Sequence, residues 1–490
     1  MMSLILLLWS LPIIFILYFQ IQKPKNANKL TPPGPPGLPI IGNMLQLDGQ
    51  FLHMYFQHLA KQYGPIISLK LGIRRVVVIS SAEAVKEISK SNDAVFSSRP
   101  TLVAMKRLTY NGIEVGFSAY SDSWREMKKI STLHLFSTKQ VQSFYPIFMD
   151  EVSKTMEKIA RDASSSTVVN FSETTTSLLG NIMFRCVFGS IYGGDQGYKK
   201  DRFKDLVREI QLIYAGFFVE DYLPWFRWID SLSGMTAKLE KNFHNMDSFC
   251  QELIEEHLNP NRPKSMEGDF IDSLLRIKEN GPSSFPLTLN HIKALIVDMV
   301  TGGSGTVVSA IVWTMTALMN KPLLMKKLQE EIRQLAGNKD MINKQDIEKL
   351  PYLRAVIKEG LRLYPPGPLL VPRETTNKCN INGYEIGGGS MVYFNAWAIG
   401  RDPTEWENAD EFLPERFLEG QHPELITFGF GRRGCPAMGM AMAEVELALA
   451  NLVYKFNWEL PKEEDIDLEC KPGIGMHKKN ALRLVAKVVI

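Results

Sequence analysis

The fold is decided by one stretch near the C-terminal end, Phe428-Gly429-Phe430-Gly431-Arg432-Arg433-Gly434-Cys435-Pro436-Ala437. Its three glycines permit a tight turn, and Pro436 suits the first turn of a helix, where a missing N–H is harmless. The apolar run 438–453 supplies that helix. Cys435 is therefore expected at a helix N-terminus beside two arginines.

That position favours a thiolate, because the helix N-terminus and nearby cations both stabilise negative charge. A thiolate is a soft metal ligand and can be the axial ligand of haem iron. Two alternatives stay open on the residues alone. A lone cysteine is usually a small buried hydrophobe. Gly429-x-Gly431-x-x-Gly434 also matches a dinucleotide fingerprint and so allows a nicotinamide dehydrogenase, but the acidic residue needed about 20 positions on is absent.

Composition excludes several classes of protein. The chain has 490 residues, of which 45% are hydrophobic and 22% charged, with a formal net charge of +3. These values exclude a disordered, collagenous or coiled-coil chain. The balanced charge gives no support to a nucleic-acid partner. The five cysteines contain no CxxC pair and are too few for a dense disulfide scaffold.

The N-terminus resembles a membrane anchor. Residues 4–21 carry no charge, and a helix of that length spans about 27 Å, close to a bilayer core. A cleaved signal peptide would want a basic residue before the apolar run, whereas the lysines follow it, at 23, 25 and 29. We expect an anchor over 1–22, a basic and proline-rich hinge over 23–43, and a catalytic domain over 44–490 on the cytosolic side. A buried N-terminal helix is the plainer alternative.

Hydrophobic periodicity predicts a mainly α fold with small β-sheets near its N-terminal side. A helix is expected over 51–63, a hairpin from Ile66–Leu71 and Arg74–Ser80, mainly helices from 82 to 360, and short strands near 378–394. Loops are expected at 259–263 and 281–284.

One predicted helix, 291–319, contains an unusual run, Gly302-Gly303-Ser304-Gly305-Thr306. Each glycine costs about 1 kcal/mol relative to alanine inside a helix, so the run needs a reason. Either another helix packs closely here, or a flat ligand approaches the backbone.

The cysteine stretch resembles the haem-binding loop of the cytochrome P450 haem-thiolate enzymes, Phe-x-x-Gly-x-Arg-x-Cys-x-Gly. Ala437 stands where that pattern has its last glycine. Three further resemblances occur in the family's order: Glu359-Gly360-Leu361-Arg362 to its Glu-x-x-Arg motif, 412–417 to its Phe-x-Pro-Glu-Arg-Phe motif, and 302–306 to its oxygen-binding helix. The resemblance covers about residues 31–490, and the N-terminus is similar to the plant-type microsomal branch.

The resemblance implies a role for each matching residue. Cys435 would ligate the iron of haem b, with Phe428 and Gly431 on the thiolate side. The haem propionates would be held by Trp124, Lys128, Arg373 and Arg433. A structural charge network would join Glu359, Arg362 and Arg416. For single charged residues, a solvated surface role is the plainer alternative.

Thr306 is implied as the proton-delivery residue on the oxygen side. The family usually has an acid before this threonine, and here Gly305 replaces it. Asp298 lies on the same helix stripe, nearly two turns earlier, and is expected to face substrate or a packing partner.

Substrate contacts are implied by family position only. They lie in mostly apolar stretches, which favours a lipophilic small molecule. The residues are Phe117, Phe217, Phe218, Asp298, Leu369, Val371, Ile474 and Met476.

Together the resemblance implies a single-pass enzyme of the endoplasmic reticulum that takes electrons from NADPH through a partner reductase. It would oxidise a hydrophobic metabolite with O₂. Two alternatives keep the fold: a haem-thiolate isomerase or dehydratase that needs no reductase, and a haem-binding protein without turnover.

Overall fold

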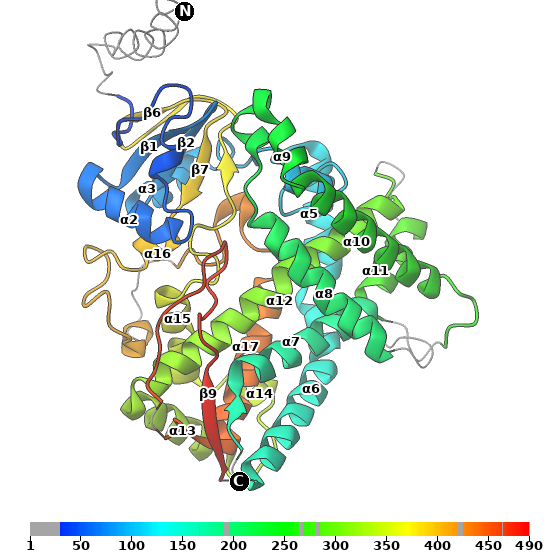
Figure 1. Ribbon diagram of the computed structural model, residues 1–490. Helices are drawn as coiled ribbons and strands as arrows, with labels where there is room; N and C mark the ends of the chain where they lie inside the picture. Colours follow the sequence, from blue (N-terminus) through cyan, green and yellow to red (C-terminus); the bar gives the residue numbers. More distant parts are fainter. Residues whose placement is uncertain are drawn as a thin grey trace, which may run out of the picture.

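A long apolar helix, α12 (Leu289–Met319), runs through the centre of the molecule (Figure 1). The side chain of Thr288 caps its first turn together with His291, and most of its residues downstream of this turn are buried. The computed structural model describes residues 30–489 apart from 166, 190–195, 264–267, 281–284, 419–424 and 463. The expected anchor at 1–22 and the loop at 281–284 lie outside the described residues.

Helices surround α12 and form most of the molecule. They are α2 (Leu52–Tyr63), α3 (Ala82–Glu87), α4 (Val103–Leu108), α5 (Asp122–Ile130), α6 (Thr138–Ser164), α7 (Phe171–Phe188), α8 (Gln196–Tyr214), α9 (Trp228–Leu232), α10 (Met235–His257), α11 (Phe270–Asn280), α13 (Pro322–Ala336), α14 (Lys344–Ile347), α15 (Pro351–Leu363), α16 (Ala396–Ile399) and α17 (Met438–Lys455). Among them, α7, α15 and α17 pack directly against α12.

The strands form three small sheets. One has the order β1-β2-β7-β4, in which β1 (Ile66–Leu71) and β2 (Arg74–Ile79) form a hairpin and β7 (Met391–Phe394) runs parallel to β2. The second has the order β3-β9-β8, and the third is the hairpin β5-β6. The remaining strands are β3 (Val169–Asn170), β4 (Arg373–Glu374), β5 (Cys379–Ile381), β6 (Tyr384–Ile386), β8 (Phe456–Glu459) and β9 (Arg483–Val488).

The mainly helical architecture with small sheets agrees with the prediction, and α2, the β1-β2 hairpin and the strands at 379–394 lie where expected. The placement of the sheets was only partly right. The sheet of β3, β9 and β8 lies at the far end from β1, beside α6 (Figure 1). Its strands are short and come from distant parts of the chain, so no hairpin signal marks them.

The end of the expected hinge lies against the first sheet. The backbone N–H of Ser68 donates to the carbonyl of Pro33 at 2.8 Å, and that of Gly72 donates to Ile41 at 3.1 Å. A β-carbon on Gly34 would lie 2.0 Å from the Ser68 carbonyl oxygen, so glycine is required for this close approach. Residues 33–43 are therefore packed on β1.

Within the described part of the chain, α12 is the one helix that is long and apolar enough to cross a membrane. Its central place in Figure 1 and its buried side chains identify it as a core helix of the folded domain.

Close packing of α15 on α12 depends on Gly360. A β-carbon at this position would lie 2.2 Å from the hydroxyl oxygen and 3.1 Å from the β-carbon of Thr314. Alanine normally stabilises a helix by about 1 kcal/mol relative to glycine, but overpacking a tight contact costs about 1–3 kcal/mol. We predict that Gly360→Ala lowers the midpoint of thermal unfolding.

Gly180→Ala is the matched control, because Gly180 lies inside α7 and no atom is within 4 Å of its missing β-carbon. There we expect only the helix-propensity gain, up to about 1 kcal/mol. A stabilising Gly360→Ala would show that the α12–α15 contact is not tight.

Candidate active site

Cys435 lies in the turn that leads into α17. Its backbone N–H donates to the carbonyl of Phe428 at 2.8 Å. Gly429 and Gly431 have φ values of 72° and 59°, a left-handed conformation that side chains disfavour. A β-carbon on Gly431 would also lie 2.0 Å from a carboxylate oxygen of Asp93. The glycines thus fold the turn that presents the cysteine.

The Cys435 thiol is solvent-accessible although protein surrounds it closely. Desolvation raises its pKa, while the backbone N–H of Ala437 and the charge of Lys128 act in the opposite direction. Nearby, Gly439 has no atom within 4 Å of its missing β-carbon.

The expectation that the adjacent arginines stabilise the thiolate is wrong. Arg432 donates to Asp93 at 2.8 Å, and Arg433 donates to the carbonyls of Ser97, Val115 and Ser118. These hydrogen bonds direct both guanidinium groups toward the loops on the far side of the turn. Lys128 is the cation that acts on the thiol.

Four buried or half-buried cations gather around this turn. Arg433 and Arg373 have pKa values lowered by burial to about 9 and about 10. Burial also lowers the pKa of Lys128 to about 8. Arg99 is buried, and desolvation followed by repulsion from Arg433 and Arg373 lowers its pKa. Concentrated positive charge of this kind favours anionic ligands.

Hydrogen bonds fix these cations. Lys128 donates to the carbonyl of Gly434 at 2.6 Å, and Arg373 donates to Phe430 at 2.7 Å. The second terminal nitrogen of Arg373 is buried without a hydrogen bond, 3.6 Å from Asp93. Trp124 donates to the Val115 carbonyl at 3.0 Å.

These residues fit a haem group. An accessible thiol is a suitable iron ligand, and an excess of buried cations, one with an unpaired N–H, suits two propionate carboxylates. Phe428 is half-buried beside the turn. The structure therefore places the sequence-predicted Trp124, Lys128, Arg373, Arg433 and Cys435 in one region.

In the glycine-rich turn of α12, one glycine allows a neighbouring helix to pack closely and another faces open space. Gly303 makes room for Met183 of α7, since a β-carbon would lie 2.1 Å from its methyl group. Gly305 faces Gln211 and His477, while Gly302 faces open space. Thr306 is exposed although the helix on both sides is buried, and its hydroxyl donates to the Gly302 carbonyl at 2.6 Å. Close helix packing therefore explains Gly303, and approach of a flat ligand at Gly302 stays a prediction.

Asp298 contacts a packing partner. It is half-buried and accepts hydrogen bonds from the backbone N–H groups of Val115 (2.9 Å) and Gly116 (3.3 Å). Its carboxyl also hydrogen-bonds Glu114, and burial raises the pKa of both groups. For Asp298, the neighbouring charge of Glu114 raises the pKa further, so Asp298 holds the shared proton. The expected packing partner at Asp298 is thus present, and its substrate contact stays a prediction.

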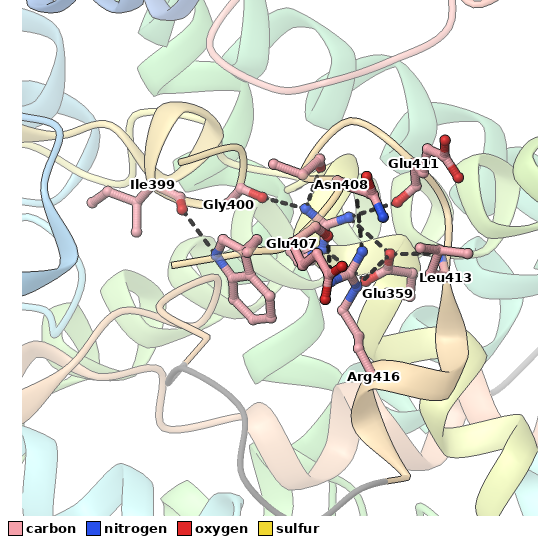
Figure 2. Close-up of polar contacts among 11 residues, drawn as sticks. Glu359, Ile399, Gly400, Glu407, Asn408, Glu411, Leu413 and Arg416 are labelled. Atoms are coloured by element: carbon pink, nitrogen blue, oxygen red, sulfur yellow. Dashed lines mark hydrogen bonds and ion pairs between the residues drawn. The ribbon is translucent and has the colours of Figure 1, made fainter. Parts of the chain in front are cut away.

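A buried charge network lies under α15 (Figure 2). Arg362 donates to both oxygens of Glu359 at 2.7 and 2.8 Å, and Arg416 donates to Glu359 at 3.1 Å. The other Arg362 donors reach the carbonyls of Gly400, Ala409 (2.6 Å) and Glu411 (2.9 Å). Every oxygen and most donors are thereby satisfied, which a buried ion pair requires.

The residues implied as substrate contacts are dispersed. Phe117 packs its ring 5.0 Å from that of Tyr214, whereas Phe217 is 53% exposed and stacks on Tyr222. Phe218 and Met476 are buried. Leu369 is half-buried, and Val371 and Ile474 are exposed. Their roles stay predictions.

Sequence reasoning missed Arg99, Glu114, Gln211 and His477. Arg99 holds three carbonyls, those of Gly116, Val371 and Pro372. No local pattern marks a buried arginine, so only the fold reveals it.

We predict that Arg362→Met lowers the free energy of unfolding by about 3–5 kcal/mol, because it leaves Glu359 and several carbonyls without their donor in a buried site. Chemical denaturation measures this. Lys326→Met, which removes an exposed helical pair with Glu330, should change stability by less than about 0.5 kcal/mol. If both variants lost the same unfolding free energy, burial of the Glu359–Arg362 pair would not explain its contribution to stability.

The Glu114–Asp298 pair predicts a pH dependence. Since the pKa of Asp298 is raised on folding, its contribution to stability is complete below about pH 4 and declines as the pH rises through the raised value. Asp298→Asn keeps a donor toward Glu114 and an acceptor for the loop. It removes the carboxyl group whose proton titrates. Its unfolding midpoint should therefore fall less than that of the wild type as the pH rises above about 4 and through the raised pKa of Asp298. If the unfolding midpoints of the wild type and Asp298→Asn change in parallel with pH, the Glu114–Asp298 pair does not share a proton.

Comparison with known proteins agrees with this site. The family model for cytochrome P450 matches residues 32–485. A 6,7,8-trihydroxycoumarin synthase of Pastinaca sativa is 43% identical over 99% of this chain and 98% of its own length. The strychnine-11-hydroxylase of Strychnos nux-vomica is 41% identical over 98% and 97%. A zebra fish cytochrome P450 solved with progesterone, 24% identical, shares the fold with a TM-score of 0.76 over 89% of this chain and 99% of that chain. The chain belongs to the cytochrome P450 family and is a haem-dependent monooxygenase.

Proposed function

We propose that this chain is a reductase-dependent P450 monooxygenase that oxidises a small, mostly apolar plant metabolite with O₂. Hydroxylation is the default, and desaturation, cyclisation or coupling are related outcomes. The accessible Cys435 thiol beside four cations carries the proposal. The relatives named for coumarin and strychnine oxidation support a ring compound as substrate.

Each residue of the site has a proposed role. Cys435 would ligate the haem iron, and Trp124, Lys128, Arg373 and Arg433 would hold the propionates, with Arg99 supporting them. When bound, haem supplies the redox chemistry that activates O₂. Arg373 would donate from its terminal nitrogen that makes no hydrogen bond, Arg433 would contribute mainly its charge because its nitrogens bind carbonyls, and Lys128 would act as a point charge.

Thr306 would hold a proton-carrying water. Its hydroxyl donates to the Gly302 carbonyl, so its lone pairs stay available to accept a hydrogen bond from water. The exposed position of Thr306 leaves room for that water. Gly305 offers no side chain that could hold a proton, so proton delivery here would depend on Thr306 and ordered water.

Electrons would come from NADPH through a partner reductase, with the chain anchored by residues 1–22 in the endoplasmic reticulum and its catalytic domain in the cytosol. Asn170-Phe171-Ser172 is a glycosylation sequon. The Asn170 side chain caps α7 by accepting from the backbone of Glu173 at 3.1 Å. If the domain is cytosolic, this sequon should stay unglycosylated.

The absence of an acid at Gly305 favours one second candidate, an isomerase or dehydratase that acts on a peroxide and needs no external electrons. The two functions separate experimentally, because only the monooxygenase requires NADPH and the reductase.

The proposal is tested with full-length protein co-expressed with a plant reductase and supplied with aromatic metabolites of the source tissue. We expect NADPH-dependent product and the red-shifted carbonyl absorption of thiolate-ligated haem. Cys435→Ser should abolish both, while Cys379→Ser, which changes a cysteine on β5, should keep both. Unaltered absorption in Cys435→Ser would overturn the ligand assignment, and product without NADPH would favour the second candidate.

A further inference from the structure

Two polar side chains converge on the turn of α12 that lacks a side chain at Gly305. A β-carbon there would lie 3.1 Å from Nε2 of Gln211, on α8, and 3.3 Å from Cε1 of His477, in the segment before β9. Because residue 305 is glycine, both groups can approach the helix backbone. Gly302 and Thr306 belong to the same turn of α12 and are both exposed.

The position of His477 is fixed by its neighbours. The carbonyl of Met476 accepts hydrogen bonds from Trp313 at 2.8 Å and from Ser309, both on α12. The His477 carbonyl accepts from the backbone of Lys471 at 2.7 Å. These contacts hold the backbone of the segment against α12 one to two turns beyond Gly305.

Gly475 also borders the space that the His477 ring occupies. A β-carbon on Gly475 would lie 3.1 Å from Nε2 of His477. Any larger residue at 475 or 305 would press on the imidazole. The ring therefore occupies a space that two glycines, distant in sequence, leave open.

Both side chains have unused hydrogen-bonding capacity. Burial, followed by the charge of Lys471, lowers the pKa of His477, so the imidazole is neutral near pH 7 and offers one donor and one acceptor. The Gln211 amide offers the same. Across the described residues, neither side chain makes a hydrogen bond to protein, and neither has a polar atom sealed from solvent. Half-buried polar groups of this kind are satisfied by water or by a ligand.

We infer that Gln211 and His477 form a polar subsite that hydrogen-bonds an uncharged oxygen substituent of the substrate and orients it beside Gly302 and Thr306. The inference rests on the proposed function and narrows its substrate class. The substrate would be a mostly apolar ring compound with a carbonyl or hydroxyl oxygen. A pure hydrocarbon would leave both groups unpaired, and neither group supplies a full charge for an ionised substrate.

The test compares two ring probes of similar size, coumarin, which carries a carbonyl oxygen, and naphthalene, which carries none. Haem-loaded, full-length protein is titrated with each probe, and the dissociation constant is read from the change in haem absorption, without turnover. The wild type should bind coumarin more tightly. Binding of neither probe, or equal binding of both, would overturn the subsite.

Gln211→Leu and His477→Phe should each weaken coumarin binding by up to about tenfold, the effect of one neutral hydrogen bond, and leave naphthalene binding unchanged. His477→Asn keeps a donor and an acceptor and should restore part of the loss. Gln251→Leu makes the same change on α10, where Gln251 donates to Glu255, and should have no effect. If a variant weakens binding of coumarin and naphthalene equally, Gln211 and His477 contribute only packing and no hydrogen bond to the probe.

Gly305→Ala provides an independent variant, because its β-carbon would displace both polar groups without removing them. It should weaken coumarin binding selectively, and retained coumarin preference would overturn the inference. The carbonyl absorption of thiolate-ligated haem is recorded for every variant. Its presence shows an intact haem site, so failure of the subsite is distinguishable from failure of the proposed function.

Discussion

The structure depends on two opposing requirements on α12, which has to be packed in the core and also has to leave one turn open. The helix runs through the core and is buried along most of its length, yet one turn, from Gly302 to Thr306, has to stay open. Bulky side chains would close that turn, and a run of glycines costs helix stability. The surrounding packing compensates for this cost. Met183 fills the space at Gly303, and Gly360 lets α15 approach further along the helix. The open turn is stable because its neighbours are tightly packed.

The second constraint is electrostatic. Arg99, Lys128, Arg373 and Arg433 are held close together, and their lowered pKa values reflect burial and mutual repulsion. Asp93 and the Glu114–Asp298 pair offset only part of this charge. The segment around Val115 links the two groups, since its N–H binds Asp298 and its carbonyl accepts from Arg433 and Trp124. A change at the acid pair is therefore transmitted to the cations through one peptide segment.

The sequence predicted the parts of this site that local motifs encode. The Cys435 turn and the helix over 291–319 are each set by neighbouring residues, so spacing and turn chemistry were sufficient. The buried Glu359–Arg362 pair was implied by the family resemblance instead. Arg99, Gln211 and His477 come from separate segments whose meeting depends on the fold. The direction of the two arginines before Cys435 was wrong for the same reason, because their partners in 93–118 are more than 300 residues away. The anchor stays a prediction from hydropathy.

Gly305 connects the chemistry of the site with its specificity. A residue that carried a proton at this position would need a side chain, and that side chain would occupy the space now filled by Gln211 and His477. An acid at this position would therefore require Gln211 and His477 to shift by at least a few tenths of an ångström. If the pair binds substrate, loss of the acid is the structural condition for that binding, and proton delivery has to rely on Thr306 and water. Reaction control and substrate orientation would then depend on the same missing β-carbon.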